Sequence, residues 1–344
     1  MNSGKFFKFH LSSLYILILL STFYVINCGS EFKSLLEEPE PLQKPVSTYQ
    51  VHVLYWAQIG GIIKSIRTDG TDERTVVNAS GSGDILDIAL YTPDNKIYWS
   101  MYSSLDGTFQ IRRAGTDGSV EELFYENANS SDHGPTAIAI DPVNAEIYWN
   151  QYQSVSSHND IWRSSITQLF PEKWENTISK PYTYGICVDT LNRKIYFTAN
   201  YYWNINLAFG SGYLGHVYIG DLDSANSYSS TLVGTGPEDP SMPFKSIAVD
   251  SNNSSIYYID NTTNLCIMKA DLSLRNPVES IISTGFGIQN IALDTENGKI
   301  YWTSNTDNSI YRADLDKPDS NIEKFIQLSN SPTGITIDQS PDLQ

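Results

Sequence analysis

Residues 290–303 read Asn-Ile-Ala-Leu-Asp-Thr-Glu-Asn-Gly-Lys-Ile-Tyr-Trp-Thr, an apolar run ending in Asp294 that is followed seven residues later by Tyr301-Trp302. A near-continuous run of β-prone apolar residues indicates a strand buried on both faces. The polar residues between the run and the aromatic pair favour a tight hairpin. The stretch therefore predicts two antiparallel strands, an inner strand and an aromatic strand.

The aromatic strand occurs six times. Its pairs are Tyr55-Trp56, Tyr98-Trp99, Tyr148-Trp149, Tyr196-Phe197, Tyr257-Tyr258 and Tyr301-Trp302. Repeats of about 40–50 residues are typical of propellers and solenoids. Each unit continues with a third run, such as Ile-Tyr-Arg-Ala at 310–313, and a fourth short run, such as 122–124. Four short strands per unit without helical periodicity predict an all-β, six-bladed β-propeller of four-stranded antiparallel blades.

The two ends of the repeat are complementary. The first unit begins at the aromatic strand, 52–56, and the chain finishes with another Asp-ended apolar run, 334–338. We expect this last run to join the first blade and close the ring, which removes exposed strand edges.

The first 28 residues predict a secretory signal, because a basic start precedes a 16-residue apolar run, 11–26. Cys28 ends a bacterial lipoprotein-like box, so lipidation at Cys28 and simple secretion both stay open. Residues 29–47 predict a flexible linker, and 48–344 the propeller. We expect a secreted or surface-anchored protein.

The formal net charge of −17 disfavours nucleic acid and anionic membranes as partners. Membrane contact is expected only through an anchor at Cys28. Cys187 and Cys266 lie in apolar runs and are interpreted as buried thiols or as a bridge between neighbouring strands. Five sequons are candidate glycosylation sites: Asn78, Asn129, Asn252, Asn253 and Asn261.

These repeats resemble the YWTD, or low-density lipoprotein receptor class B, propeller family. The resemblance rests on 290–303 with 310–316 and on 137–149, and it extends through all six units. It implies a secreted, usually protein-binding, non-catalytic ring. The family's Asp after Tyr-Trp-Thr is kept only at Asp260, so blade packing must rely on other contacts. The cysteine-rich modules that flank receptor propellers are absent, so lipoprotein-receptor function does not transfer.

One face of the ring is a candidate binding surface. The hairpins between the second and third strands are long at 100–110, 150–160 and especially 199–215. Their aromatic residues are Tyr102, Phe109, Tyr152, Tyr201, Tyr202, Trp203, Phe209 and Tyr213. We expect either one contact surface on three adjacent blades or a loop that caps its own core.

The channel is the second candidate site. The starts of the inner strands place Asp87, Ser246 and Asn290 at its mouth. Calcium prefers six or more oxygen ligands, so we expect neither a catalytic metal nor a cofactor, with a structural ion in the channel left open. The histidines lack zinc spacing, and a nucleophile elbow is missing from the sequence, so we assign no catalytic residues.

The sequence thus favours a monomeric, non-catalytic propeller that binds an extracellular protein, peptide or glycan. The alternative is a metal-dependent lactonase- or hydrolase-like propeller with its site at the channel. A third interpretation is a structural surface protein whose ring is a spacer.

Overall fold

The computed structural model describes residues 49–128, 131–154, 158–175, 182–204, 211–235, 244–260, 266–274, 279–283 and 287–340. The chain divides into two compact units, Met1–Tyr49 and Gln50–Gln344, and the described strands lie in the second. The predicted leader and linker, Cys28, Asn129, Asn261 and Phe209 lie outside the described residues.

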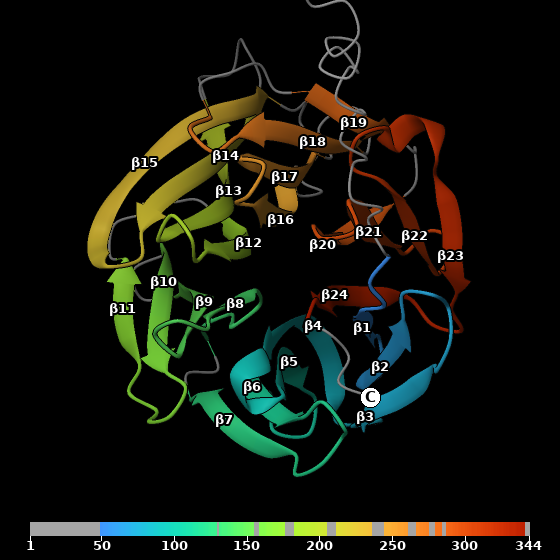
Figure 1. Cartoon of the computed structure of the whole chain (residues 1–344). Helices are drawn as coiled ribbons and strands as arrows, with labels where there is room; N and C mark the ends of the chain where they lie inside the picture. The colour runs from blue at the N-terminus through green and yellow to red at the C-terminus, as the bar shows by residue number, and fades with distance from the viewer. Residues whose placement is uncertain are drawn as a thin grey trace, which may run out of the picture. The chain divides into compact units, whose positions relative to one another are not determined.

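Six four-stranded antiparallel sheets form a ring, and each sheet is one blade of a six-bladed β-propeller (Figure 1). This confirms the predicted fold. From inner to outer strand, blade 1 is β24 (Pro332–Asp338), β1 (Val53–Gln58), β2 (Ile62–Arg67) and β3 (Arg74–Asn78). Blade 2 is β4 (Gly83–Tyr91), β5 (Lys96–Ser103), β6 (Thr108–Gly115) and β7 (Glu122–Asn127). Blade 3 is β8 (Ile138–Asp141), β9 (Glu146–Gln153), β10 (His158–Ser165) and β11 (Glu172–Glu175).

The second half of the ring follows the same order. Blade 4 is β12 (Tyr182–Asp189), β13 (Lys194–Asn204), β14 (Ser211–Asp221) and β15 (Ser224–Thr235). Blade 5 is β16 (Phe244–Asp250), β17 (Ser255–Asp260), β18 (Cys266–Asp271) and β19 (Glu279–Ser283). Blade 6 is β20 (Ile288–Asp294), β21 (Lys299–Ser304), β22 (Ser309–Asp314) and β23 (Glu323–Gln327). Two short 3-10 helices, Thr92–Asp94 and Pro318–Ser320, lie in turns.

The C-terminal strand closes the ring as predicted. In Figure 1 the red β24 lies beside the blue β1. The two strands pair antiparallel, with Leu54 opposite Ile337 and Trp56 opposite Ile335. Ile335 also packs in one buried cluster with Leu54, Trp56 and Tyr301 of blade 6. The first blade is therefore assembled from both ends of the chain.

The aromatic pairs form the core between blades. Trp99, Trp149, Trp302 and Phe197 are fully buried. In three blades the second aromatic residue of a pair stacks on an aromatic residue opposite it in the third strand: Trp302 lies on Tyr311 with ring centroids 5.6 Å apart, Phe197 on Tyr218 at 4.9 Å and Trp149 on Trp162 at 6.5 Å. Burial between blades is common to all six of these aromatic residues, and cross-strand stacking adds to it in blades 3, 4 and 6.

The Asp that ends an inner strand ties its blade to the next. Asp141, Asp189 and Asp294 are completely buried. Each accepts a hydrogen bond from the N–H of its own turn, and each also receives a donor from the following blade. These donors are Arg193 Nη1 at 2.8 Å to Asp141, Ser251 Oγ at 2.6 Å to Asp189 and His52 Nδ1 at 3.0 Å to Asp294. Each Asp thus caps its own turn, and its bond to the following blade is one of the contacts that join neighbouring blades.

The long hairpins differ from the prediction in one respect. The predicted hairpins are mostly strand. In blades 2 and 3, β5 continues to Ser103 and β9 to Gln153, which covers much of 100–110 and 150–160. In blade 4, β13 ends at Asn204 and β14 begins at Ser211, which covers most of 199–215. The hairpin of blade 4 is the longest, with Tyr202 paired to Tyr213 in register. The consecutive aromatic residues Tyr201, Tyr202 and Trp203 favour a strand, which explains the two-stranded extension.

Candidate functional site

The inner strands carry a β-bulge near one end of the channel. In five blades, two residues of one strand oppose one residue of the other near the start of the inner strand, for example between Ile85 and Asp87 and between Phe244 and Ile247. A bulge re-aims the side chains beside it. The predicted channel-mouth residues Asp87, Ser246 and Asn290 lie at or beside these bulges, and all three line one central cavity.

These three side chains form a hydrogen-bonded polar belt, a name used below for Asp87, Asn290 and Ser246. Asp87 Oδ1 accepts hydrogen bonds from the Ile88 N–H and from Asn290 Nδ2, each at 3.0 Å. Asp87 Oδ2 accepts from the Ile138 N–H of blade 3 at 3.0 Å. Ser246 Oγ donates to Asn290 Oδ1 at 2.6 Å. The belt thus joins side chains from blades 2, 5 and 6 to the backbone of blade 3.

A glycine makes the longest step of the belt possible. Asp87 and Asn290 belong to blades 2 and 6, and β24 of blade 1 contacts both of their inner strands. A Cβ on Gly334 of β24 would lie 3.0 Å from the Ile88 nitrogen and 3.1 Å from Asp87 Cα. Contacts this short are tighter than most side chains tolerate, so glycine lets β4 approach β24 closely enough for Asp87 to reach Asn290.

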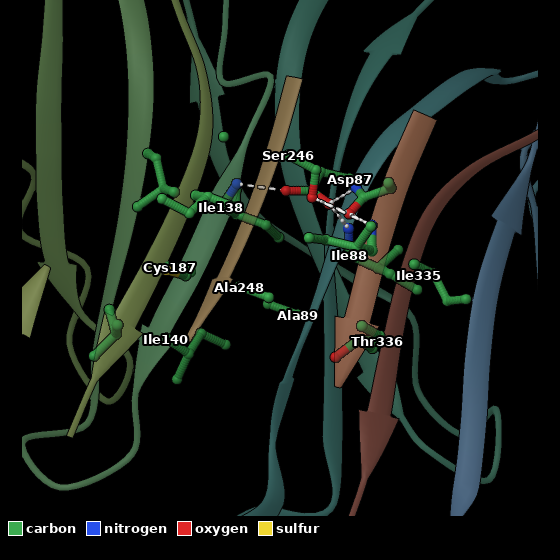
Figure 2. A pocket seen from close by; sticks show the side chains of 18 of the residues that line it. Asp87, Ile88, Ala89, Ile138, Ile140, Cys187, Ser246, Ala248, Ile335 and Thr336 are labelled. Atoms are coloured by element: carbon green, nitrogen blue, oxygen red, sulfur yellow. Dashed lines mark hydrogen bonds between the residues drawn. The ribbon is translucent and has the colours of Figure 1, made fainter. Parts of the chain in front are cut away.

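The cavity has a volume of about 670 Å³ and apolar walls beyond the belt. Successive positions along the six inner strands form tiers. The first tier consists of Ile88, Ile138, Ile186, Ile247, Ile291 and Ile335, and the second of Ala89, Ala139, Cys187, Ala248, Ala292 and Thr336. Figure 2 shows Asp87 and Ser246 at one end of the cavity and Ala89, Ala248 and Thr336 farther along it. The site therefore combines a polar mouth with an aliphatic interior.

Burial controls the ionisation of Asp87. Removal from water raises its pKa from an ordinary value of 3.8 to about 6, even though the N–H groups of Ile138 and Ile88 and the amide of Asn290 pull it down. A folded-state pKa above the unfolded one means that protonation stabilises the fold. This contribution is fully present below the unfolded value, and it is lost as the pH rises through about 6.

We therefore expect protonation of Asp87 to raise the free energy of unfolding as the pH falls through about 6. Between about pH 7.5 and about pH 4.5, the free energy of unfolding should rise by about 2 kcal/mol relative to an Asp87→Asn variant, which cannot titrate. Urea unfolding of both proteins at the two pH values measures this difference and cancels the titration of the other carboxylates. An equal pH dependence in the two proteins would contradict the assignment.

The second candidate site is an exposed aromatic row on blades 2 and 3. Tyr102 and Phe109 face each other across β5 and β6 with ring centroids 5.1 Å apart. Phe109 lies 5.8 Å from the ring of His133, and His133 lies 5.9 Å from Tyr152 of β9. Tyr102 is 42% exposed, and His133 is also exposed. The structure thus brings three predicted residues together through a histidine that the sequence interpretation missed.

The position of His133 is fixed by its neighbours. Buried Asp132 accepts hydrogen bonds from the N–H and hydroxyl of Ser154, at 2.7 and 2.8 Å. Asn127 Nδ2 donates to the Gly134 carbonyl at 2.9 Å, and His133 pairs with Tyr152 through a β-bridge. A lone histidine between two strands gives no repeat signal. The sequence signal for His133 is its position just before Gly134-Pro135, in the segment that leads into the inner strand β8.

The remaining members of the predicted surface belong to blade 4. Tyr201, Tyr202 and Trp203 lie in β13 and Tyr213 lies in β14, where the backbone pairing is described. Their side chains, and Phe209 entirely, lie outside the described residues. Whether they extend the aromatic row onto a third blade stays a prediction.

The other predicted residues have simple surroundings. Cys187 and Cys266 are both free thiols, so the bridge interpretation is wrong for this structure. Cys187 lines the channel wall and Cys266 is buried. Asn78, Asn252 and Asn253 are exposed, and Asn253 also donates its amide to Asp250 at 2.8 Å within a turn. Glycosylation of these residues stays a prediction.

The belt does not fit a divalent cation as it stands. Both Asp87 oxygens and the Asn290 Oδ1 face N–H or O–H donors rather than the channel, whereas calcium takes six or more oxygen ligands. Among the described residues, no group of three or more His, Cys, Asp or Glu side chains is placed to hold a metal. The structural ion left open by the sequence stays untested. In the part of the chain that the structure describes, no helix has the length and apolar character to span a membrane.

Comparison with known proteins places the chain by its fold. No family model matches the sequence, and no curated protein matches it. A chain of a nidogen/laminin complex superposes with a TM-score of 0.62 at 17% identity, covering 83% of this chain and 98% of that one. TolB from Acinetobacter baumannii gives 0.61 at 11% identity over 83% and 66%. The gluconolactonase XC5397 from Xanthomonas campestris gives 0.52 at 13% identity over 81% and 84%. At these identities the likeness establishes the propeller fold alone.

Proposed function

We propose that this chain is an exported, non-catalytic propeller of the YWTD type that binds a protein, peptide or glycan on the face bearing the hairpins of blades 2–4. The observation that carries the proposal is the aromatic row of Tyr102, Phe109, His133 and Tyr152. Large aromatic side chains held in place by strands are typical of the residues that dominate binding energy in interfaces. A neighbour of the same fold comes from a nidogen/laminin complex, which supports a protein partner.

The row and the channel mouth belong to the same face. Tyr102 lies opposite Asp84, at the start of β4, while Asp87 follows three residues later in the same strand. A partner that covers the row would therefore lie beside the polar belt. The net charge of −17 favours a neutral or basic partner over an acidic one.

We expect a Tyr102→Ala, Phe109→Ala double variant to lose at least tenfold in affinity for its partner, because truncating a central aromatic anchor costs about 2 kcal/mol or more. Immobilised protein would be exposed to surface and secreted proteins and glycans of the producing cells, and retained material would be titrated by interferometry. The matched control is Val143→Ala, Leu191→Ala, two exposed apolar residues in turns on the opposite face. Equal binding by the double variant and the control would contradict the proposed surface.

The alternative is hydrolysis at the channel, and it is supported by a gluconolactonase among the proteins of the same fold. Turnover of a lactone panel by the wild type that disappears on Asp87→Asn, with partner binding intact, would favour this alternative. Turnover that is unaffected by the substitution would point to a contaminant.

A further inference from the structure

One cation at the rim of the cavity lacks a carboxylate partner. Lys245 lies in β16, one residue before Ser246 of the polar belt, and it lines the cavity. Its Nζ donates to Gln289 Oε1 at 2.8 Å. Within the described residues, no carboxylate lies within 4.0 Å of Lys245, whereas Arg163, Arg193 and Lys299 each have one. Desolvation also lowers the pKa of Lys245, so its charge is poorly compensated where it stands.

The other charged group of the cavity does not neutralise this lysine. Asp87 is the one carboxylate among the described lining residues, and its oxygens accept three hydrogen bonds from Ile88, Ile138 and Asn290. An ionised Asp87 also disfavours a second anion at its own level of the channel. An anion attracted by Lys245 is therefore best placed at the rim, beside the Gln289 amide.

The space beyond the rim suits an apolar chain. The isoleucine tier and the small-residue tier offer aliphatic walls inside a cavity of about 670 Å³. The four lining residues from Ser246 to Val249 span about 10 Å of channel at the usual rise of a strand. An unbranched chain of six to eight carbons, roughly 10 Å long, fits this length.

We propose that the channel binds a small monocarboxylate with an aliphatic tail, the carboxylate at Lys245 and Gln289 and the tail along the isoleucine and alanine tiers. A single cation favours a singly charged head group. The Asp87 carboxylate and the net charge of −17 oppose a dianion such as phosphate. This site is independent of the aromatic row and of the proposed partner.

The test is titration calorimetry of the purified full chain with acetate, butanoate, hexanoate and octanoate. Affinity should rise about fourfold per added methylene, because each buried CH₂ contributes a constant transfer free energy. Octanol, which has the tail without the charge, should bind at least tenfold more weakly than octanoate. Phosphate should not bind measurably. Equal affinity for acetate and octanoate would overturn the placement of the tail, and equal affinity for octanol and octanoate would overturn the role of the charge.

Substitution of the lysine completes the test. Lys245→Met should lower octanoate affinity about tenfold to a hundredfold, the usual effect of losing a hydrogen bond to a charged group, and Lys245→Arg should retain most of it. Removing a poorly compensated charge should leave the melting temperature unchanged or higher, so Lys245→Met should fold. The Tyr102→Ala, Phe109→Ala variant should bind octanoate like the wild type, which separates this site from the partner surface. Unchanged octanoate affinity in Lys245→Met would overturn the proposal.

Discussion

A chain that ends at Ser331 is expected not to fold into the closed ring. Such a chain lacks β24, so β1 loses its inner partner and presents an unpaired edge to the channel. Ile335 also leaves the buried cluster that contains Trp56 and Tyr301. Exposed edges and newly exposed aromatic residues both promote aggregation. We therefore expect loss of the whole free energy of folding, which is about 5–15 kcal/mol for a typical domain.

Size-exclusion chromatography and thermal unfolding followed by circular dichroism would measure this effect. A chain that ends at Ser340 keeps the whole of β24 and is the matched control. We expect the control to be soluble and to melt like the full chain. A soluble monomer with a native melting temperature from the chain that ends at Ser331 would show that the ring holds without its closing strand.

Replacement of Trp302 by Ala is expected to destabilise the protein by about 3–5 kcal/mol, the usual cost of emptying a buried aromatic site. Trp302 is completely buried, packs in one cluster with Ile259 of blade 5 and Ile288 of blade 6, and stacks on Tyr311. Its indole N–H has no hydrogen-bond partner among the described residues. The loss is therefore one of packing and stacking, with little polar contribution.

Trp302→Phe is the matched control for this prediction. Blade 4 has Phe197 at the equivalent position, where it stacks on Tyr218 with the rings almost parallel. We expect the Phe variant to cost about 1–2 kcal/mol, clearly less than the Ala variant. Urea unfolding gives both values. Equal loss in the two variants would mean that the indole makes a contact that a benzyl ring cannot replace.

The repeat unit could be predicted because its signals are local and repeated. A run such as Ile291 to Asp294, a fixed gap and Tyr301-Trp302 specify a hairpin, and six copies in phase specify the number of blades. Ring closure could also be predicted, since the unpaired run at 334–338 has one place to bind. The bulges were not visible in the sequence, because they depend on how β4 and its equivalents bend around the channel rather than on residue type.

The candidate sites were only partly predictable. Asp87, Ser246 and Asn290 could be placed at the channel mouth by alignment of the repeats, but their hydrogen bonds require the close approach that Gly334 allows. Lys245 was overlooked because it lies one residue before the aligned position. The structure shows that the preceding positions line the cavity as well.

The ties between blades differ from one junction to the next at three of the six junctions. Buried Asp141, Asp189 and Asp294 occupy equivalent positions, yet they are met by a guanidinium, a hydroxyl and an imidazole respectively. Each of these three junctions therefore depends on a different donor group. A duplicated unit inserted at one of these junctions would place a buried acid opposite a donor that belongs to a different junction. These differences between junctions therefore favour a fixed number of blades. Substitutions in the surface hairpins leave the junctions unchanged and are easier to accommodate.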